Sequence, residues 1–481
     1  MQRLSTIALA LVAAVPFGCG GSGNDGAPPQ TAADASEDAT DDGGAEASST
    51  IEAGAPSEAS TLDYGAPSST FPAFPPDVGQ IQYNAGYVMT TPVIVPITWD
   101  VDGSQASFDV FASHIGVTGY FKATTGEYGV MAAVSAPPVH LTGAAPAQLE
   151  DTDLQNMIKA NAGVVDADAG SSVDAGDDGG SDEGGATPAW PAPTPNTIYA
   201  FFLPPKTSLV LTAAQGGAGD ACSQGIGGYH DQVTVGGVTT AYAVVPSCQF
   251  SYDLSAHDQS TTSMSHEIVE ASTDPQPNAK FNGWTGFDPD HFAFDWYQQF
   301  QSELADACEF FPSSTYEDQE KTPPFDFYVQ RTWSNQSAAA GHDPCVPGLA
   351  GPYFNVTPMD LTYVSVTLPT YVTGASGPEV VTTKGMRILP GHTGALAFGF
   401  YSDGPTGGPW TVSASEGDGT GRDSNAGNLT VTIDKPSGQN GEKAYATVSV
   451  SSAGPYKAEL LTLQSTLNGV SHVMPVVISS E

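Results

Sequence analysis

VIVPITW at Val93–Trp99 and TIYAFFL at Thr197–Leu203 are short apolar runs rich in β-branched and aromatic residues, a composition typical of buried strands. Thr240–Val245 is a third run of the same kind. Between these runs, apolar residues recur at helical spacing over residues 108–115 and 154–158. Strands that alternate with helices in this way predict a mixed α/β domain.

This domain is expected to span residues 71–347, and a different pattern follows it. From about residue 350 the chain consists of short β-rich runs separated by Gly, Pro, Asn and Asp. The runs are Tyr363–Leu368, Ala395–Tyr401, Leu429–Ile433, Ala446–Ser451 and His472–Ile478. Their spacing predicts an all-β, immunoglobulin-like sandwich domain at 350–481. Because titratable groups do not gather there, we interpret it as an accessory or adhesion module.

The charge of the chain limits its partners. Its 481 residues include 53 Asp and Glu against 13 Lys and Arg, a formal net charge of -40. Such a balance argues against binding to nucleic acid, which requires basic residues to neutralise phosphates. Many of the acids lie in two stretches rich in Gly, Ser and Asp, which predict a disordered tether at 20–70 and a disordered insertion at 164–190.

The N-terminus predicts export. A short basic start is followed by an apolar run, Leu4–Phe17, and then by Gly-Cys at residues 18 and 19. Residues 1–19 are similar to a bacterial lipoprotein signal peptide with Cys19 as the lipidated residue, although Pro16 stands where Leu is usual. The alternative is cleavage nearby and release. We therefore expect an outer-membrane or cell-surface lipoprotein, or a secreted protein, that meets the membrane only through a lipid anchor.

The remaining cysteines predict disulfides. Cys222, Cys248, Cys308 and Cys345 are four cysteines in a chain expected to be exported, so they indicate two disulfide bonds. Three connectivities are open, and we favour Cys222–Cys248 and Cys308–Cys345 because these are sequence neighbours. The absence of a Cys-x-x-Cys pair from the sequence argues against a zinc site built from sulfur alone.

The segment SHEIVEASTDP at Ser265–Pro275 carries the chemistry. It predicts a helix on which His266 and Glu270 lie one turn apart, so that both side chains reach the same point. Zinc proteases use this geometry in His-Glu-x-x-His, where two ligands flank a general base. We therefore predict that His266 and Glu270 hold Zn²⁺ and that Glu267 activates water. The alternative is a surface helix whose charged residues face solvent.

A second predicted helix, Phe294–Phe310, carries Glu303 and Asp306 at helical spacing. Thermolysin-like zinc proteases complete their site with a glutamate from a downstream helix, and an aspartate nearby orients a ligand histidine. By that analogy Glu303 is the third zinc ligand and Asp306 the orienting carboxylate, with the two roles exchangeable. The fold predicted for residues 71–347 is then zincin-like. The alternative is that both residues are helix-surface carboxylates.

These motifs occur in a recognisable order. The segments are His266–Glu270, Thr273–Pro275, Trp284 and Glu303–Cys308. Because these segments follow one another in this order, the chain resembles the EXORDIUM/phosphate-induced protein family of secreted plant proteins and their bacterial relatives. The resemblance covers about 79–347 and implies a site shared with that family, which is associated with growth and the cell wall and has no established reaction.

His230 completes the set of candidate residues. It lies in a Gly-rich turn, and an accessory histidine of this kind polarises a substrate carbonyl in zinc proteases. The alternative is a loop histidine that the backbone satisfies. We expect an exported zinc metallopeptidase-like hydrolase that acts on a peptide or cell-wall substrate. The competing interpretation is a non-catalytic surface, wall-binding or adhesion protein with a structural or vestigial metal site.

Overall fold

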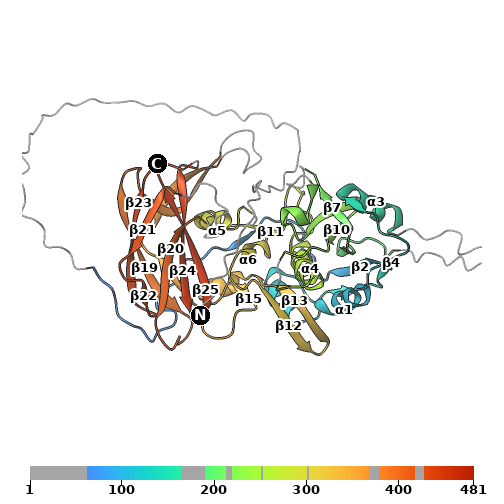
Figure 1. The fold of residues 1–481 in the computed structure, drawn as a ribbon, viewed down its shortest axis with the longest axis horizontal. Helices are drawn as coiled ribbons and strands as arrows, with labels where there is room; N and C mark the ends of the chain where they lie inside the picture. Colours follow the sequence, from blue (N-terminus) through green and yellow to red (C-terminus); the bar gives the residue numbers. More distant parts are fainter. Residues whose placement is uncertain are drawn as a thin grey trace, which may run out of the picture.

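The computed structural model describes residues 62–163, 190–212, 219–250, 253–300, 303–368, 379–417, 427–454 and 456–481. The chain is mostly β structure, arranged in several sheets (Figure 1). The predictions for the signal peptide, for Cys19 and for almost all of the acidic insertion lie outside the described residues.

A mixed sheet forms the centre of the first domain, and the two opening apolar runs lie side by side in it. Its main strands, in spatial order, are β3 (Val134–Ser135), β2 (Val93–Trp99), β6 (Thr197–Phe202), β10 (Val238–Val245) and β9 (Tyr229–Val235), with β4 (Val139–Leu141) also paired to β2. The strands β2, β6 and β10 are parallel, whereas β9 pairs antiparallel with β10 at the edge. Every residue of β6 is buried, which explains its unbroken apolar sequence.

Helices cover both faces of this sheet. On one face, α1 (Gln105–Ile115), α2 (Gly119–Thr125) and α4 (Ala256–Thr273) share an apolar core with the sheet. On the other face, α3 (Asp151–Asn161) packs through Leu154 and Ile158. The predicted alternation of strands and helices is therefore confirmed as layers around a sheet.

Short elements surround these layers. Small sheets are formed by β5 (Gln148–Glu150), β7 (Ser208–Leu211) and β8 (Gly219–Asp220), by β1 (Ile81–Tyr83) and β11 (Trp284–Phe287), by β12 (Thr315–Lys321) and β13 (Pro324–Gln330), and by β14 (Thr332–Trp333) and β15 (Cys345–Val346). The remaining helices are η1 (Gly126–Tyr128), η3 (Cys222–Gln224), η4 (Pro289–His291), α5 (Phe292–Tyr297), α6 (Asp306–Glu309) and α7 (Asn335–Ala340).

The C-terminal region forms two facing sheets, drawn in orange and red in Figure 1. One sheet has the order β16 (Phe354–Pro358), β19 (Thr393–Ser402), β23 (Lys443–Val450) and β21 (Leu429–Ile433). The other has the order β17 (Thr362–Leu368), β18 (Glu379–Arg387), β25 (Val470–Ser479), β24 (Ala458–Leu467), β20 (Trp410–Glu416) and β22 (Ser437–Gly438). Phe398 and Phe400 of the first sheet share a core with Leu461 and Met474 of the second. All five predicted runs are strands, and one pairing, β18 with β25, is parallel.

The expected end of the tether needs correction. Residues 62–70 lie against the C-terminal sheets instead of extending away from them. Tyr64 donates a hydrogen bond to Asp434, and Lys443 forms an ion pair with Asp63. Asn440 donates to the backbone oxygens of Ser68 and Thr70, satisfying polar groups of a segment that has little apolar surface of its own.

The single helix predicted over Phe294–Phe310 is also wrong, because the chain forms α5 and α6 with a break between them. The helix ends where Gln299 and Phe300 adopt positive φ angles of 57° and 65°, which right-handed helices do not contain. The aromatic rings of α5 pack on the C-terminal sheets, and Trp296 meets Tyr456 with 5.0 Å between ring centroids. The packing of α5 on the C-terminal sheets therefore accounts for the break between α5 and α6.

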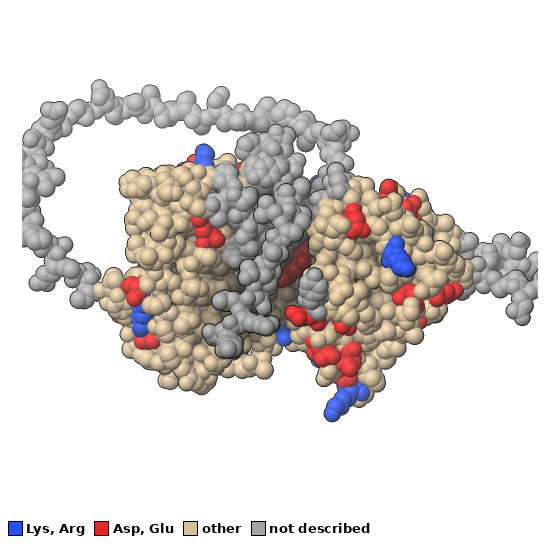
Figure 2. Space-filling view, in the orientation of Figure 1, with Lys and Arg blue, Asp and Glu red and all other residues tan. Residues whose placement is uncertain are grey.

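The surface of the protein is acidic (Figure 2), as the composition of the sequence indicates. On the face shown in Figure 2, acidic side chains outnumber basic ones and gather over the hairpin formed by β12 and β13. None of the helices in the described ranges is long and apolar enough to cross a bilayer.

A half-buried ion network joins the two parts of the molecule. His291 Nε2 lies 3.0 Å from Asp77 Oδ1, its Nδ1 lies 2.7 Å from Asp288 Oδ1, and Lys384 Nζ of β18 lies 2.6 Å from Asp77 Oδ1. Burial alone would lower the pKa of His291, but Asp288 and Asp77 outweigh it and raise this pKa to about 9. Protonated His291 therefore forms ion pairs with Asp77 and Asp288 where the two parts of the molecule meet.

The stability of the protein should fall between pH 6.5 and 9 because of His291. Its folded-state pKa lies above the ordinary value, so its contribution is complete below about pH 6.5 and is lost as the pH rises through 9. Urea denaturation should show that the free energy of unfolding of wild type falls by about 3 kcal/mol more than that of His291→Gln between pH 6.5 and 9. His392→Gln, at an exposed histidine, is the control. Equal losses in wild type and His291→Gln would contradict the assignment.

Candidate metal centre

Three of the candidate site residues, His266, Glu267 and Glu270, lie on the largely buried helix α4. Ser255 caps its N-terminus by accepting a hydrogen bond from the backbone of Asp258, and the helix ends at Thr273, two residues before the proline expected to stop it. Strands β6, β9, β10 and β13 all contact it. Glu267 and Glu270 are only 5% and 3% exposed. The alternative of a charged helix facing solvent is therefore wrong, and these carboxylates need partners inside the protein.

His266 is held so that one of its nitrogens faces the acidic residues. Gln330 donates its amide Nε2 to the backbone oxygen of Ala305 at 2.8 Å, which leaves its Oε1 to accept from His266 Nδ1 at 3.1 Å. His266 Nε2 then points to Glu270 Oε2 at 3.0 Å and Asp306 Oδ1 at 3.4 Å. A histidine that donates from one ring nitrogen in this way presents the other as a metal ligand.

The predicted carboxylates do meet at α4, although the helix expected to carry them is broken. Glu270 Oε1 accepts hydrogen bonds from the backbone nitrogens of Ala305 at 3.2 Å and Asp306 at 3.0 Å. These bonds bring the segment with Glu303 and Asp306 to His266. Asp306 faces the same nitrogen of His266 as Glu270, so the orienting partner on the other nitrogen is Gln330, which the sequence reasoning missed. Its bond comes from a strand 64 residues away.

His230 on β9 lies inside the cluster. Its Nδ1 is 3.6 Å from Glu267 Oε2 and 3.7 Å from Glu270 Oε2, and its Nε2 is 3.5 Å from Glu303 Oε2. The Nε2 atom also lies 3.1 Å from the backbone oxygen of Asp274. His230 is thus placed as a potential ligand as well as an accessory catalytic group, and it is more than a loop histidine satisfied by backbone.

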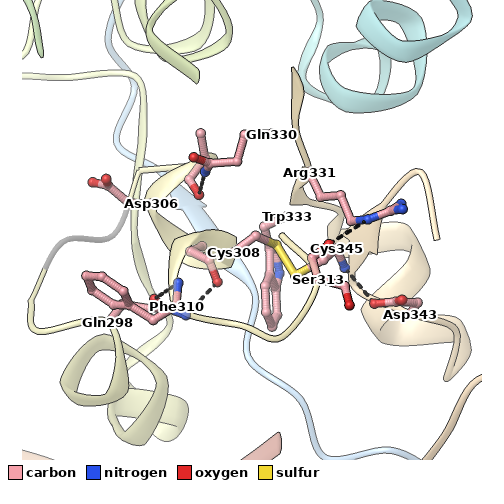
Figure 3. Close-up of a disulfide and its surroundings, with 12 residues drawn as sticks. Gln298, Asp306, Cys308, Phe310, Ser313, Gln330, Arg331, Trp333, Asp343 and Cys345 are labelled. Atoms are coloured by element: carbon pink, nitrogen blue, oxygen red, sulfur yellow. Dashed lines mark hydrogen bonds between the residues drawn. A yellow bond between two sulfur atoms is a disulfide. The ribbon is translucent and has the colours of Figure 1, made fainter. Parts of the chain in front are cut away.

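Disulfides secure both segments that meet α4. Cys308–Cys345 joins α6, two residues after Asp306, to β15 (Figure 3). Cys222–Cys248 joins η3, which precedes β9, to the segment after β10. The favoured connectivity is confirmed. Gln298, which is fully buried, donates to the backbone oxygen of Ala307 at 2.8 Å and holds the same segment from α5.

Opposite charges set the protonation of the cluster. Burial would lower the pKa of His230 and His266, but Glu303 and Glu267 around the first and Glu270 and Glu267 around the second raise both values well above 6.5. Burial raises the pKa of Glu267 despite the two histidines. For Glu270 the balance is reversed, because the histidines outweigh burial and lower its pKa.

The donor set fits a divalent cation. Four carboxylates carry four negative charges, and the ion pairs formed among described residues are with two histidines, which supply at most two positive charges. Two negative charges are left for a cation or for protons. Ligand atoms around a tetrahedral Zn²⁺ lie about 3.3–3.5 Å apart, given bonds of about 2.0–2.1 Å. Glu270 Oε2 and Asp306 Oδ1 lie 3.0 and 3.4 Å from Nε2 of His266, close to that separation.

Comparisons with known proteins add no functional information. No protein-family model and no curated protein matches the sequence. Solved structures that match include a chimeric titin Z1Z2 carrying an exogenous decorin peptide, at 11% identity over 26% of this chain and 95% of the other, with a TM-score of 0.14. Domains 4 and 5 of the S-layer protein SbsC match at 13% identity over 32% of this chain and 85% of the other, with a TM-score of 0.15. Scores this low carry no argument.

The packing of β9 on α4 predicts that Gly228 tolerates no side chain. A Cβ atom there would lie 2.9 Å from Glu267 Oε1 and 2.9 Å from the backbone oxygen of Val244. Gly228→Ala should therefore lower the free energy of unfolding by about 1–3 kcal/mol, measured by urea denaturation. Gly126→Ala is the matched control because nothing lies within 4 Å of its added Cβ. Equal stability of the two variants would show that β9 does not approach Glu267 this closely.

Proposed function

We propose that the chain is an exported zinc-dependent hydrolase of the metallopeptidase type. The observation that carries the proposal is the buried cluster of two histidines and four carboxylates around α4, with its excess of negative charge and its ligand-like spacing. The sequence assigns the ion to His266, Glu270 and Glu303. In the structure, ligand atoms within 4.8 Å of one another come from His230, Glu270 and Glu303 in one group and from His266, Glu267 and Glu270 in another. Glu270 is common to both groups, and His230 is the histidine grouped with Glu303.

The residues of the chain divide into holding, orienting and proton-transfer roles. A zinc ion bound there would act as a Lewis acid and lower the pKa of a coordinated water to about 7. Gln330 fixes the ring of His266, and the backbone of Ala305 and Asp306 fixes Glu270. Glu267, whose pKa burial raises above its ordinary value, would accept a proton and return it to a leaving group. His230 would supply positive charge to an oxyanion.

The proposal also includes that the protein is exported and that it is related to the EXORDIUM family. The two disulfides indicate an oxidising, extracellular environment. The EXORDIUM resemblance is supported by the way in which its separate motifs, on α4 and around α6, meet at one cluster. Lipidation at Cys19 remains a prediction from the sequence.

The purified full chain should contain one zinc ion per molecule. Replacing a ligand nitrogen in His266→Ala should weaken zinc binding by more than about 100-fold, since removing even an outer partner of a ligand costs 10–100-fold. Elemental analysis and competition with a chromophoric chelator measure this. His140→Ala, whose partner is Asp109, is the control and should retain zinc. Zinc content unchanged by His266→Ala, or absent from wild type after reconstitution, would exclude the site.

Glu267→Gln should abolish hydrolysis without releasing the metal. Loss of a general base lowers turnover by about 10²–10⁴-fold, while an amide keeps the size of the carboxylate. The assay is cleavage of a broad peptide library, followed by mass spectrometry, with and without a chelator.

The competing function is a non-catalytic surface protein with a structural metal. It is favoured by Glu270, since a carboxylate in place of a second histidine makes zinc a weaker Lewis acid. Chelator-sensitive cleavage by wild type that Glu267→Gln also retains would show that the base is assigned wrongly. Zinc-loaded wild type that cleaves nothing in the library would favour the structural role.

A further inference from the structure

A cavity lies at the joint between the two parts of the molecule, and its lining includes none of the residues of the candidate metal centre. Its outer part has a volume of about 270 Å³ and is lined by residues including Pro352, Tyr353, Thr406 and Asn468. A narrow inner part of about 20 Å³, room for roughly one oxygen-sized group, continues from it. Asp343, Leu349, Tyr353 and His472 line both parts, so the two are continuous.

The inner end is lined by Arg331, a buried cation that forms no close ion pair in the described chain and interacts with the Asp343 carboxylate only at longer range. This residue is 7% exposed. Its Nε donates to the backbone oxygen of Ser313 at 3.0 Å (Figure 3). Its guanidinium stacks on the ring of Tyr316 at 4.2 Å. Its buried Nη1 has no hydrogen-bond partner among the described residues. No described carboxylate lies within ion-pair distance, although a buried cation ordinarily requires one.

His472 on β25 supplies a second unsatisfied polar group. Its ring packs edge-on against Tyr353 and Phe354, with centroid separations of 4.5 and 4.9 Å. Burial lowers its pKa to about 4, so the imidazole is neutral at pH 7 and offers one donor and one acceptor. The ring is half-buried and lines both parts of the cavity, and it forms no hydrogen bond to another residue among those described. Two polar side chains that lack partners thus line one cavity with apolar walls.

The remaining walls limit what fits. Phe294, Phe311 and Met474 make the inner part apolar. Asp343 is the acidic residue in the lining, and its oxygens accept hydrogen bonds from the backbone of Cys345 at 3.1 Å and of Leu349 at 3.4 Å. Its carboxylate interacts electrostatically with Arg331 and repels any anionic ligand, so a ligand with two carboxylates is disfavoured more than a ligand with one.

We propose that this cavity binds a small monocarboxylate with a flat apolar body. One carboxylate oxygen accepts from Arg331 Nη1 at the inner end, His472 hydrogen-bonds the ligand, and the apolar body lies beside Tyr353 and Leu349 in the outer part. Cavities with apolar walls and a few convergent polar groups are the usual form of small-molecule sites. A charge-assisted bond to a buried guanidinium provides the selectivity for an anion.

The test is calorimetric titration of the full chain with benzoate. We expect saturable binding with a Kd of about 0.1–1 mM, reasonable for a ligand of this size. Benzyl alcohol, which lacks the charge, and terephthalate, which carries a second one, should each bind at least about 10-fold more weakly. Arg331→Met should lower benzoate affinity by at least about 10-fold, whereas Arg387→Met, at a surface arginine that donates to the backbone of Glu481, should not.

A second variant, Leu349→Trp, tests the same cavity independently in case Arg331→Met does not fold. Leu349→Trp fills the outer part of the cavity and leaves Arg331 in place, so it should also block benzoate. No saturable binding of benzoate to wild type would overturn the proposal, and so would equal binding of benzoate and benzyl alcohol. Benzoate affinity that survives Leu349→Trp would place the ligand elsewhere and overturn it equally.

Discussion

The burial of two carboxylates on one helix, Glu267 and Glu270, is the constraint on which the rest of the first domain depends. Withdrawing an ionised carboxylate from water costs several kcal/mol unless hydrogen bonds and opposite charge replace the solvent. For Glu270 the replacement comes from the backbone of residues 305 and 306 and from His266. For Glu267 it comes from His230 on an edge strand. The fold therefore has to bring a strand and a distant segment to the same helix.

That distant segment is held by more than α4. Gln298 hydrogen-bonds it from α5, the Cys308–Cys345 disulfide fixes it to β15, and α5 in turn packs its aromatic rings on the C-terminal sheets. The C-terminal domain is thus not simply appended as an accessory module. Through α5 it supports the chain that delivers Glu303 and Asp306, and an error in its packing would be transmitted to the carboxylates two short helices away.

Sequence patterns predicted elements whose signal is local. Buried strands such as β2 and β6, the helix at α4 and the later β runs were all identified, because period and composition report burial directly. The positive φ angles at Gln299 and Phe300 were not predictable, since neither is a glycine and the turn is imposed by packing on the C-terminal sheets. Gln330 was missed for a related reason. A neutral amide carries no chemical signature until a distant histidine lies beside it.

The carboxylate that replaces a second histidine also changes how the cluster exchanges protons. Burial and neighbouring acids raise the pKa of Glu267 and Asp306, while His230 and His266 retain their protons to higher pH than isolated histidines. Without a cation, the excess negative charge is therefore neutralised by protons. A divalent cation would compete directly with them, because histidine must be neutral and carboxylate ionised to act as ligands. Affinity for the cation must then rise with pH. Glu267, whose pKa burial raises, is also the residue that the sequence motif independently marks as the base.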